Sequence, residues 1–450
     1  MKKLSALLLG GLSICVGATS QKASANTEAK PYVIVISLDG LPARALEDPM
    51  LPMPTLRLLA SHGSFATAMR PINPTVTWPN HTTLVTGVDA SKHHVMANGL
   101  IKFSANEAEP EIEPWINKDK LVHAHTLYEA AAEKGLTTGQ VDWVAIYGAR
   151  GVTWHFGEKP DPASPISQEL VSQGILTQDQ VAHFGAGSSP AWRDEIWTDA
   201  AVDIIEQHAP NLLLLHLLQT DSIQHMYAPM TPAAYVAYAY ADTCIARVVE
   251  AVRKEGLLDR TTFFIVSDHG FASFTHSIHI NVALQQQGLL RREGDRYAGS
   301  VLVKAEGGAA QVFIPDTKQR ALLLPRLKTY LESLPGVAHV YTNEEALAIG
   351  LPSEHDTDQA PQLFLTADRD YAFSDDAADS LVTTHPAEGQ HGYLNTDSDM
   401  QALFVASGAH IRQGVQLGAI TNLRIAPTVA AVLGVDLRSA QEKPLTEILK

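Results

Sequence analysis

Acidic and imidazole side chains recur directly after apolar segments of this chain. Asp39 follows an apolar run that begins at Tyr32, and Asp268 and His269 follow a second run, TFFIV. Unbroken apolar runs are typical of strands buried on both faces of a parallel sheet, where ligands bind beyond the carboxyl ends. The three polar side chains are therefore predicted to lie at one binding edge.

Three further residues enlarge this set. Asp221 and His225 come after the apolar run that ends at Leu218, and their spacing of four places both on one face of a helical turn. His391 lies in a loop flanked by glycines. Three carboxylates and three imidazoles, with no sulfur, form a donor set suited to two zinc ions.

Each of these residues also has a commonplace interpretation. An Asp after a strand is often a helix cap or a turn residue, and a lone loop histidine is usually exposed. Asp268-His269-Gly270 by itself is compatible with a turn. The recurrence of such residues after three separate apolar runs favours a shared metal site over unrelated turns.

Thr77 is the candidate nucleophile. It lies two residues before Pro79 in the segment PTVTWPNHTTLVTG. Proline fits the first turn of a helix, so Thr77 is expected at or just before a helix N-terminus. Free backbone N–H groups there favour a phosphate group and a developing alkoxide. Taken alone, the same pattern also fits an ordinary threonine cap.

These candidates need a sheet and helices to position them. Apolar runs predict buried strands at Tyr32–Ser37, Asn211–Leu218, Thr262–Val266 and Ala402–Ala406. Helical periodicity that ends near glycine predicts helices at Pro54–His62, Thr126–Lys134, Ala233–Lys254 and Lys318–Leu334. This alternation predicts an α/β fold with a doubly wound, mostly parallel sheet and helices on both faces. A single domain is expected over residues 31–450, with a loop-rich insertion at about 106–193.

Composition narrows the classes of function. The chain has 450 residues, 45% of them hydrophobic and 18% charged, which is typical of a globular protein. Its formal net charge of -16 disfavours a nucleic-acid duplex as a partner. A small phosphate ester remains a plausible substrate, because bound metal ions can invert the local field.

The N-terminus predicts an export signal. Lys2 and Lys3 precede a mostly apolar stretch over residues 4–16, and small residues follow it, so residues 1–25 are expected to be a signal peptide cleaved after Ala18 or Ala25. The protein is then periplasmic or secreted. No later segment offers about 18 uninterrupted apolar residues, so no transmembrane segment is expected in the mature chain.

The cysteine count limits the metal ligands. The chain has two cysteines, and Cys15 would be removed with the signal peptide, which leaves Cys244 alone. A disulfide framework and a cysteine metal site are therefore excluded in the mature chain. Any metal ion must be held by His, Asp and Glu.

From Asp39 to about Gly434, the chain resembles the nucleotide pyrophosphatase/phosphodiesterase branch of the alkaline-phosphatase superfamily. The resemblance rests on five blocks in a fixed order: LDG at 38–40, TWPNH with TLVTG over 77–87, Asp221-x-x-x-His225, SDHG at 267–270 and GQHGY at 389–393. It implies an alkaline-phosphatase-like domain. Thr82, His94, Val144-Ala145, Gln224 and Ala228 depart from the family pattern, and several lie where substrate side groups bind.

The resemblance also implies roles for single residues. Thr77 matches the nucleophile, which forms a phosphothreonine intermediate, and Asn98 matches an asparagine that hydrogen-bonds a phosphoryl oxygen. Trp78 stands where the family often has Phe, beside the substrate base or leaving group. One zinc ion would be held by Asp39, Thr77, Asp268 and His269. The other would be held by Asp221, His225 and His391.

These implications lead to one expected function and two alternatives. We expect a two-zinc hydrolase of phosphodiester or pyrophosphate bonds, because Thr77 and Asn98 bring no extra cation for a monoester dianion. An alkaline phosphatase acting on monoesters is the first alternative, with Arg150 as its candidate cation. The second alternative is a non-catalytic periplasmic metal-binding or solute-binding module. The natural substrate and the oligomeric state are left open by the sequence.

Overall fold

The computed structural model describes residues 30–103, 110–294 and 296–450. The predicted signal peptide, residues 1–25, lies outside the described residues. Pro31–Lys450 forms one compact unit, and the description below concerns this unit. Among the described residues, no helix combines the length and the apolar character needed to cross a bilayer.

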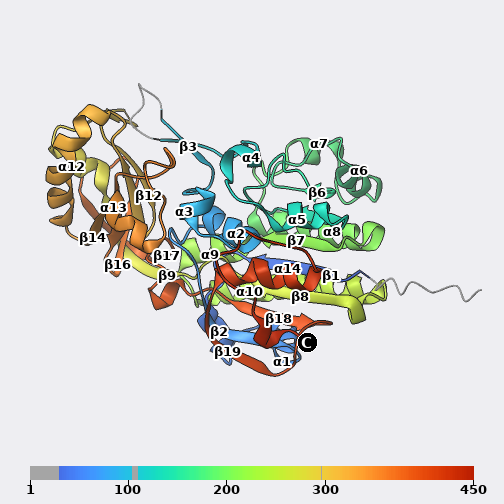
Figure 1. Cartoon of the computed structure of the whole chain (residues 1–450). Coiled ribbons are helices and arrows are strands. Elements are labelled where there is room, and N and C mark those ends of the chain that lie inside the picture. The colour runs from blue at the N-terminus through green and yellow to red at the C-terminus, as the bar shows by residue number, and fades with distance from the viewer. Residues whose placement is uncertain (1–29, 104–109, 295) are drawn as a thin grey trace, which may run out of the picture. The chain divides into compact units, whose positions relative to one another are not determined.

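An eight-stranded sheet forms the centre of this unit (Figure 1). Its strand order is β19-β2-β18-β8-β1-β7-β5-β6. The strands are β1 (Tyr32–Leu38), β2 (Ser64–Arg70), β5 (Thr138–Val141), β6 (Trp154–Phe156), β7 (Leu212–Leu217), β8 (Thr261–Val266), β18 (Phe404–Gly408) and β19 (Val415–Thr421). β1 pairs in parallel with β7 and β8, whereas β18 is antiparallel to both of its neighbours. The predicted α/β fold with a mostly parallel sheet is confirmed.

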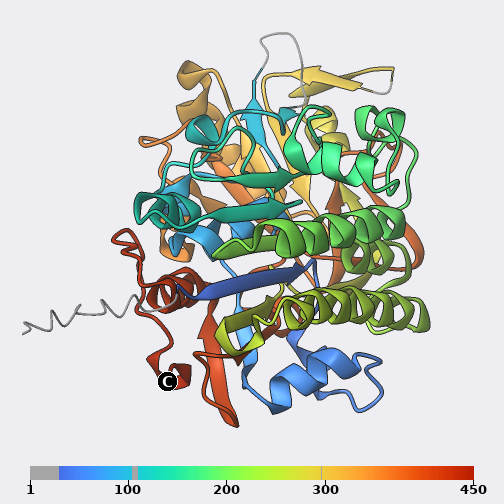
Figure 2. The ribbon, with the colours of Figure 1, turned by 90° about the vertical axis from the view of Figure 1, so that its right-hand side faces the viewer.

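Helices cover both faces of the sheet. Successive strand residues point to opposite faces, and the central strands β1, β7 and β8 are mostly apolar, so both faces must be covered. On β1, Ile34 and Ile36 pack in one hydrophobic cluster, and Val33 and Val35 pack in another. The first cluster includes residues of α1 (Pro54–Ser61), α6 (Pro165–Ser172), α8 (Pro190–Asp203) and α10 (Pro232–Lys254). The second includes residues of α2 (Thr77–Thr86), α5 (Leu127–Glu133) and α14 (Ile425–Leu433). Figure 2 shows α8 and α10 side by side along the sheet, in green and yellow-green.

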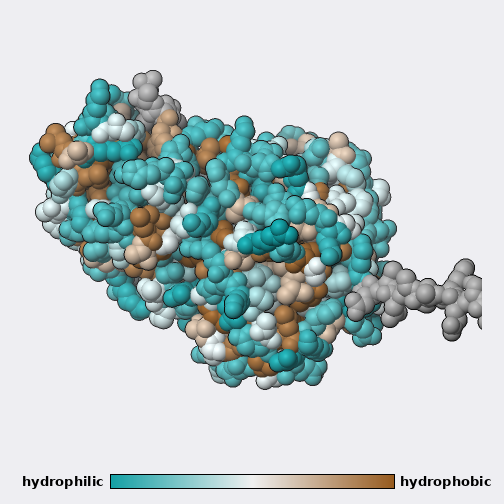
Figure 3. Space-filling model, in the orientation of Figure 1, coloured by the Kyte–Doolittle hydropathy of each residue, from teal (hydrophilic) through white to brown (hydrophobic). Residues whose placement is uncertain are grey.

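The predicted elements agree closely with the observed ones. All four predicted strands appear, as β1, β7, β8 and β18, and all four predicted helices appear, as α1, α5, α10 and α12 (Thr317–Glu332). α5 begins as the sequence indicates, because Thr126 and Glu129 form a reciprocal capping box. Polar residues cover most of the face seen in Figure 3, and apolar residues appear there in scattered patches.

The predicted insertion at 106–193 needs a correction. This segment contains β5 and β6, which extend the central sheet beyond β7. β5 reads TGQV, and all four residues are buried although only one is strongly apolar. Because the strand lacks an apolar run, its sequence looked like a loop.

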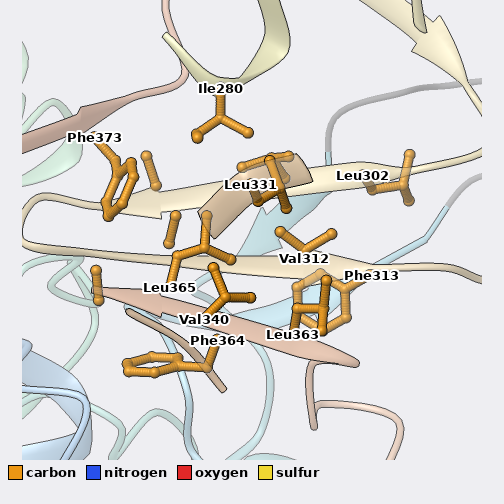
Figure 4. Packing of buried hydrophobic residues seen from close by; sticks show 14 of the residues in the cluster. Ile280, Leu302, Val312, Phe313, Leu331, Val340, Leu363, Phe364, Leu365 and Phe373 are labelled. Atoms are coloured by element: carbon orange, nitrogen blue, oxygen red, sulfur yellow. The ribbon is translucent and has the colours of Figure 1, made fainter. Parts of the chain in front are cut away.

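A second sheet comes from a region that the sequence analysis did not set apart. Its strands, in the order β12-β13-β15-β14, pair antiparallel. They are β12 (Leu302–Glu306), β13 (Ala309–Phe313), β14 (Val337–Thr342) and β15 (Leu363–Ala367). With α11 (Ile280–Gln286) and α12, they enclose a separate hydrophobic core, in which Val340, Leu331 and Leu365 lie close together (Figure 4).

A three-stranded sheet lies next to the ends of the parallel strands. It contains β9 (Ala272–His279), β16 (Asp370–Ser374) and β17 (Val382–Gln390) in the order β16-β9-β17. β9 starts soon after β8, and β17 ends one residue before His391. β17 also contacts α9 (Gln219–Tyr227), the helix that follows β7. This sheet therefore carries His391 to the carboxyl ends of β7 and β8.

Candidate active site and metal centre

The carboxyl ends of β8, β1 and β7 bring the predicted acidic residues together. Asp39 directly follows β1, Asp268 follows β8, and Asp221 lies in the first turn of α9 after β7. The three strands are neighbours in the sheet, and the Asp39 backbone N–H donates to the Leu217 carbonyl at 3.0 Å. All three aspartates are buried.

The three histidines join these carboxylates in one cluster. His269 Nε2 lies 3.2 Å from Asp268 Oδ2 and 3.5 Å from Asp39 Oδ1. Asp221 Oδ1 lies 3.3 Å from His225 Nε2 and 3.9 Å from His391 Nε2. The rings of His269 and His391 stack with centroids 4.0 Å apart. We call these six side chains the catalytic-edge cluster.

The grouping of ligand atoms differs slightly from the one that the resemblance implies. Asp221, His225 and His391 offer atoms that all lie within 4.8 Å of one another, which is the implied second set. The other close group joins Asp39 and His269 to Asp221, rather than to Asp268. Asp221 thus lies within reach of both groups, between Asp39 on one side and His225 on the other.

Each imidazole is held in the orientation that a metal ligand needs. The Nδ1 atoms of His269, His225 and His391 lie 3.1, 3.2 and 3.0 Å from the carbonyl oxygens of Gly270, Gly389 and Thr75. A carbonyl oxygen can only accept, so Nδ1 carries a proton in each ring, and Nε2 is the nitrogen left to face the carboxylates. All three Nε2 atoms face the carboxylates. A metal ion binds Nε2 in the tautomer that carries its proton on Nδ1.

Four buried atoms of the cluster have no hydrogen-bond partner within the described residues: Asp39 Oδ1, Asp221 Oδ1, Asp268 Oδ2 and His269 Nε2. A buried carboxylate oxygen and a neutral imidazole nitrogen that face each other both carry partial negative charge. They repel each other unless a cation lies between them. Among the described residues, the basic side chains close to these carboxylates are imidazoles only, and no Lys or Arg pairs with them. The donor set and its orphaned atoms therefore fit divalent cations.

The pKa values of the cluster show the same crowding of charge. Burial raises the pKa of Asp39 well above its usual range, and the Asp268 and Asp221 carboxylates raise it further. Burial also lowers the pKa of His391 well below its usual range, with His269 and His225 adding to the effect. His391 is therefore neutral at physiological pH, as a metal ligand must be.

Thr77 is the first residue of α2, as predicted, and it is 8% exposed. Asn80 fixes the segment before it, because its side chain donates to the carbonyls of Pro74 and Val76. The Thr75 carbonyl, two residues before Thr77, accepts from His391 Nδ1 and from the Gly392 N–H. The helix N-terminus that carries Thr77 is thus tied to the loop that carries His391.

Gly392 makes this connection possible. Its φ is +90°, and a Cβ atom at this position would lie 1.7 Å from the Glu306 carbonyl oxygen. Only glycine tolerates both the positive φ and the close approach. The loop after β17 can therefore turn sharply enough to direct His391 toward Asp221.

The Asn98 side chain is bound to the backbone of Trp78. The Trp78 N–H donates to Asn98 Oδ1 at 3.1 Å, which satisfies one free N–H of the α2 N-terminus. This bond leaves the Asn98 amide NH2 as a donor. The Trp78 side chain packs with Val95, Leu121 and Val122 and is 8% exposed.

Two residues behind Asp39 were missed by the sequence analysis. His216 Nε2 lies 3.1 Å from Asp39 Oδ2, and His216 Nδ1 lies 2.9 Å from Asp142 Oδ2. Both His216 and Asp142 are buried. Burial raises the pKa of Asp142 to about 7, against the opposing effect of the His216 hydrogen bond. His216 was the available signal, as the one polar side chain in LLLLHLL.

A cavity of about 370 Å³ lies beside Trp78. Aromatic side chains line it, including Trp115, Trp143 and Tyr147, together with Lys159. The Lys159 ammonium lies 5.5 Å from the centre of the Trp115 ring. Arg150, the candidate extra cation, has an 81% exposed side chain and pairs with Asp119 at 3.2 Å, so it belongs to the surface.

Comparison with known proteins agrees with this geometry. A model of the family "Type I phosphodiesterase / nucleotide pyrophosphatase" matches residues 33–394. Ectonucleotide pyrophosphatase/phosphodiesterase family member 3 of Bos taurus is 21% identical over 88% of this chain and 41% of its own length. Family member 7 of Homo sapiens is 23% identical over 90% of this chain and 80% of its own length. The chain thus spans less than half the length of some of these relatives.

Solved structures show the same fold. Murine ectonucleotide pyrophosphatase/phosphodiesterase 5, as an inactive Thr-to-Ala variant in complex with AMP, superposes with a TM-score of 0.67 at 17% identity. The match covers 94% of this chain and 100% of the murine chain. The human counterpart gives the same TM-score at 18% identity. Because the family model matches most of the chain, this protein belongs to the type I phosphodiesterase/nucleotide pyrophosphatase family.

Proposed function

We propose that this protein hydrolyses phosphodiester or pyrophosphate bonds in nucleotide-type or related esters, with Thr77 as the nucleophile and two Zn²⁺ ions as cofactors. One observation carries the proposal. Three imidazole Nε2 atoms and three buried carboxylates, whose facing oxygens lack partners, converge near the helix N-terminus where Thr77 lies. Such a donor set suits zinc, and the adjacent hydroxyl supplies a group that can attack phosphorus.

We assign the metal ligands as the resemblance implies. Asp39, Thr77, Asp268 and His269 would hold one ion, and Asp221, His225 and His391 would hold the other. When bound, the two ions would lower the pKa of the attacking hydroxyl and balance the charge that develops on the phosphoryl group. The nearness of Asp221 to Asp39 and His269 keeps the two sets adjacent.

The chain's own residues then perform defined steps. The Thr77 hydroxyl gives its proton to solvent water, and Oγ1 bonds to phosphorus while the bond from phosphorus to the leaving oxygen breaks. The leaving oxygen takes up a proton from water. The Asn98 amide donates to a non-bridging oxygen, since its Oδ1 is already engaged by the Trp78 N–H. Water then cleaves the threonine phosphate ester and restores the hydroxyl. Throughout, His216 holds the second oxygen of Asp39, and Asp142 holds His216 in place.

Charge favours diesters over monoesters as substrates. A diester carries one negative charge fewer than a monoester dianion, and Arg150 points to solvent instead of supplying a balancing cation. The cavity beside Trp78 offers aromatic faces to a flat group attached to phosphorus. Lys159, which also lines this cavity, is the cation that would support the monoesterase alternative.

The relatives support both the substrate class and the location. Their names contain nucleotide pyrophosphatase and phosphodiesterase activities, and a murine relative is described with bound AMP. The inactive form of that relative carries a Thr-to-Ala change, in agreement with a catalytic role for a threonine. The prefix "ecto" and the signal-like N-terminus of this chain support export to the periplasm or the medium.

A substrate panel tests the proposal. We expect higher kcat/KM for bis-p-nitrophenyl phosphate and for a p-nitrophenyl nucleotide ester than for p-nitrophenyl phosphate, with a phosphocholine ester as a fourth arm. Activity should disappear after thorough chelation and return with added ZnCl2. Zinc binding without hydrolysis of any ester would instead support the non-catalytic module, and a preference for p-nitrophenyl phosphate would support the alkaline phosphatase alternative.

A further inference from the structure

A second carboxylate–imidazole cluster lies away from the catalytic edge. It consists of Glu169 on α6, Asp203 at the end of α8 and His208 at the end of the π-helical turn η2 (Ile204–His208), and we call it the peripheral cluster. Its three ligand atoms all lie within 4.8 Å of one another. Figure 1 shows α6 next to α8, and the two helices pack together.

The π-helical turn is what brings two of these residues to one side. Asp203 and His208 are five positions apart, and in an α-helix that spacing would turn their side chains well away from each other. A π-helix advances about one turn in that distance, because its hydrogen bonds join residues five apart. The Ala209 N–H bonds to the Ile204 carbonyl in this way. Such turns are rare and occur frequently at functional sites.

A buried oxygen in the peripheral cluster lacks a partner. Asp203 is 3% exposed, and its Oδ1 accepts from the Gln173 side chain while Oδ2 has no hydrogen-bond partner among the described residues. Glu169 is an ion-pair partner of His208, at 2.9 Å, and no ion pair joins Asp203 to a described residue. Burial, and then the Glu169 carboxylate, raise the pKa of Asp203 to about 6. Two carboxylates thus share a space without a described Lys or Arg bound to either.

The surroundings hold the imidazole in place and leave a path for an ion. The His208 ring stacks on Trp154, with centroids 3.7 Å apart and planes 14° apart. The side chains of His208 and Glu169 are 15% and 31% exposed, so solvent reaches the cluster. Two oxygen donors and one imidazole nitrogen suit zinc-class cations better than calcium or magnesium, which favour oxygen alone.

We propose that Glu169, Asp203 and His208 bind one Zn²⁺ ion at a structural site separate from the catalytic centre. The π turn ends just before β7, and Trp154 is the first residue of β6. The site therefore lies at the amino ends of these parallel strands, whereas the catalytic-edge cluster lies at the carboxyl edge of the sheet. An ion here would clamp α6 to the end of α8. It would stabilise the fold without touching substrate.

Zinc content tests this site independently of the proposed function. Asp203→Asn and His208→Gln should each bind one zinc equivalent fewer than the wild-type protein, whatever the number held at the catalytic edge. Both variants should hydrolyse bis-p-nitrophenyl phosphate as the wild type does. His183→Gln is the control, because His183 also pairs with a carboxylate, Asp179, but on an exposed helix outside the cluster. It should keep the wild-type zinc content.

Thermal unfolding separates metal binding from ordinary packing. In chelated protein, Asp203→Asn should unfold at the same temperature as the wild type or above it, since it removes one of two facing carboxylates. With added ZnCl2, the wild type should gain a few degrees more than the variant, because an ion that binds only the folded state stabilises it. If His208→Gln does not fold, Asp203→Asn still tests the site, because an asparagine side chain has nearly the same shape as the aspartate that it replaces. Equal zinc content and equal ZnCl2-induced shifts in variant and wild type would overturn the proposal.

Discussion

The catalytic-edge cluster and the peripheral cluster contain the same kinds of donor atom at opposite ends of one sheet. At the catalytic edge, backbone carbonyls fix all three imidazoles, and His391 is bound to the segment that leads into the N-terminus of α2. At the peripheral cluster, ring stacking on Trp154 fixes the imidazole, and the neighbours are packed helices. Similar donor atoms therefore stand in different surroundings, and we expect the groups beside such a cluster to decide whether it takes part in turnover.

The topology of the sheet explains this division. Parallel strands deliver several loops to their carboxyl edge, and those loops can place a nucleophile, a donor and a cavity around one point. The amino ends receive the connections from helices, as where η2 leads into β7. Changes at the catalytic edge should consequently alter turnover, and changes at the peripheral cluster should alter stability.

The largest effect is expected at the nucleophile. Thr77→Ala should lower kcat for bis-p-nitrophenyl phosphate by roughly 10⁴-fold or more, because the covalent route is lost. Thr77→Ser should keep part of the activity, since it retains a hydroxyl at the start of α2. Steady-state kinetics on the purified variants measures the effect. Undiminished turnover in Thr77→Ala would show that another group attacks phosphorus.

The next effect concerns the donor to the phosphoryl oxygen. Asn98→Ala should slow kcat by about 10²-fold, the usual cost of one lost donor to a developing charge. Asn98→Asp is the matched control, because it keeps the acceptor for the Trp78 N–H but loses the amide donor. Both variants should be slow if donation matters. If Asn98→Asp is fully active, the role of Asn98 is only to cap α2.

Each cluster has a supporting residue that can be changed, Asp142 at the catalytic edge and Gln173 at the peripheral cluster, and the two changes should differ in their effect on activity. Asp142→Asn weakens the support of His216 and Asp39, and it should reduce zinc affinity or activity by about 10-fold to 100-fold. Gln173→Ala removes the side chain that holds Asp203 at the peripheral cluster, and it should leave kcat and KM unchanged. Zinc titration followed by activity assays distinguishes the two. Equal loss of activity in both variants would mean that the clusters are coupled.

The sequence predicted the parts of the site that follow apolar strands. Asp39, Asp268 and His269 come shortly after such strands, and Thr77 lies two residues before a proline in the first turn of α2, so their positions could be inferred from local pattern. The positions of the residues that support them, Asp142 and His216, could not be inferred in this way. Asp142 and His216 meet because β5 and β7 pair, and β5 was hidden by its polar, buried sequence.

The fold was predictable to a similar degree. Unbroken apolar runs indicate strands that are buried on both faces, and for this reason β1, β7 and β8 could be predicted. The second sheet contains short antiparallel strands, of which β12 and β13 are joined by the turn at Gly307-Gly308, and its sequence gives no sign of a separate core. The peripheral cluster depends on a π turn, and no periodicity in the sequence indicated that Asp203 and His208 share a face.

The smallest expected effect concerns the cavity beside Trp78. Trp78→Ala should raise KM for aromatic esters by about 10-fold and change kcat far less, because the indole offers a flat apolar face outside the reacting atoms. Trp78→Phe is the control, since it preserves an aromatic face. The indole also packs with Val95 and Leu121, so the alanine variant should first be shown to unfold cooperatively. An ester with a small methyl group should then show little change in KM. If kcat falls equally for the methyl and aromatic esters, Trp78 acts by positioning Thr77, and the cavity is not the site of the aromatic group.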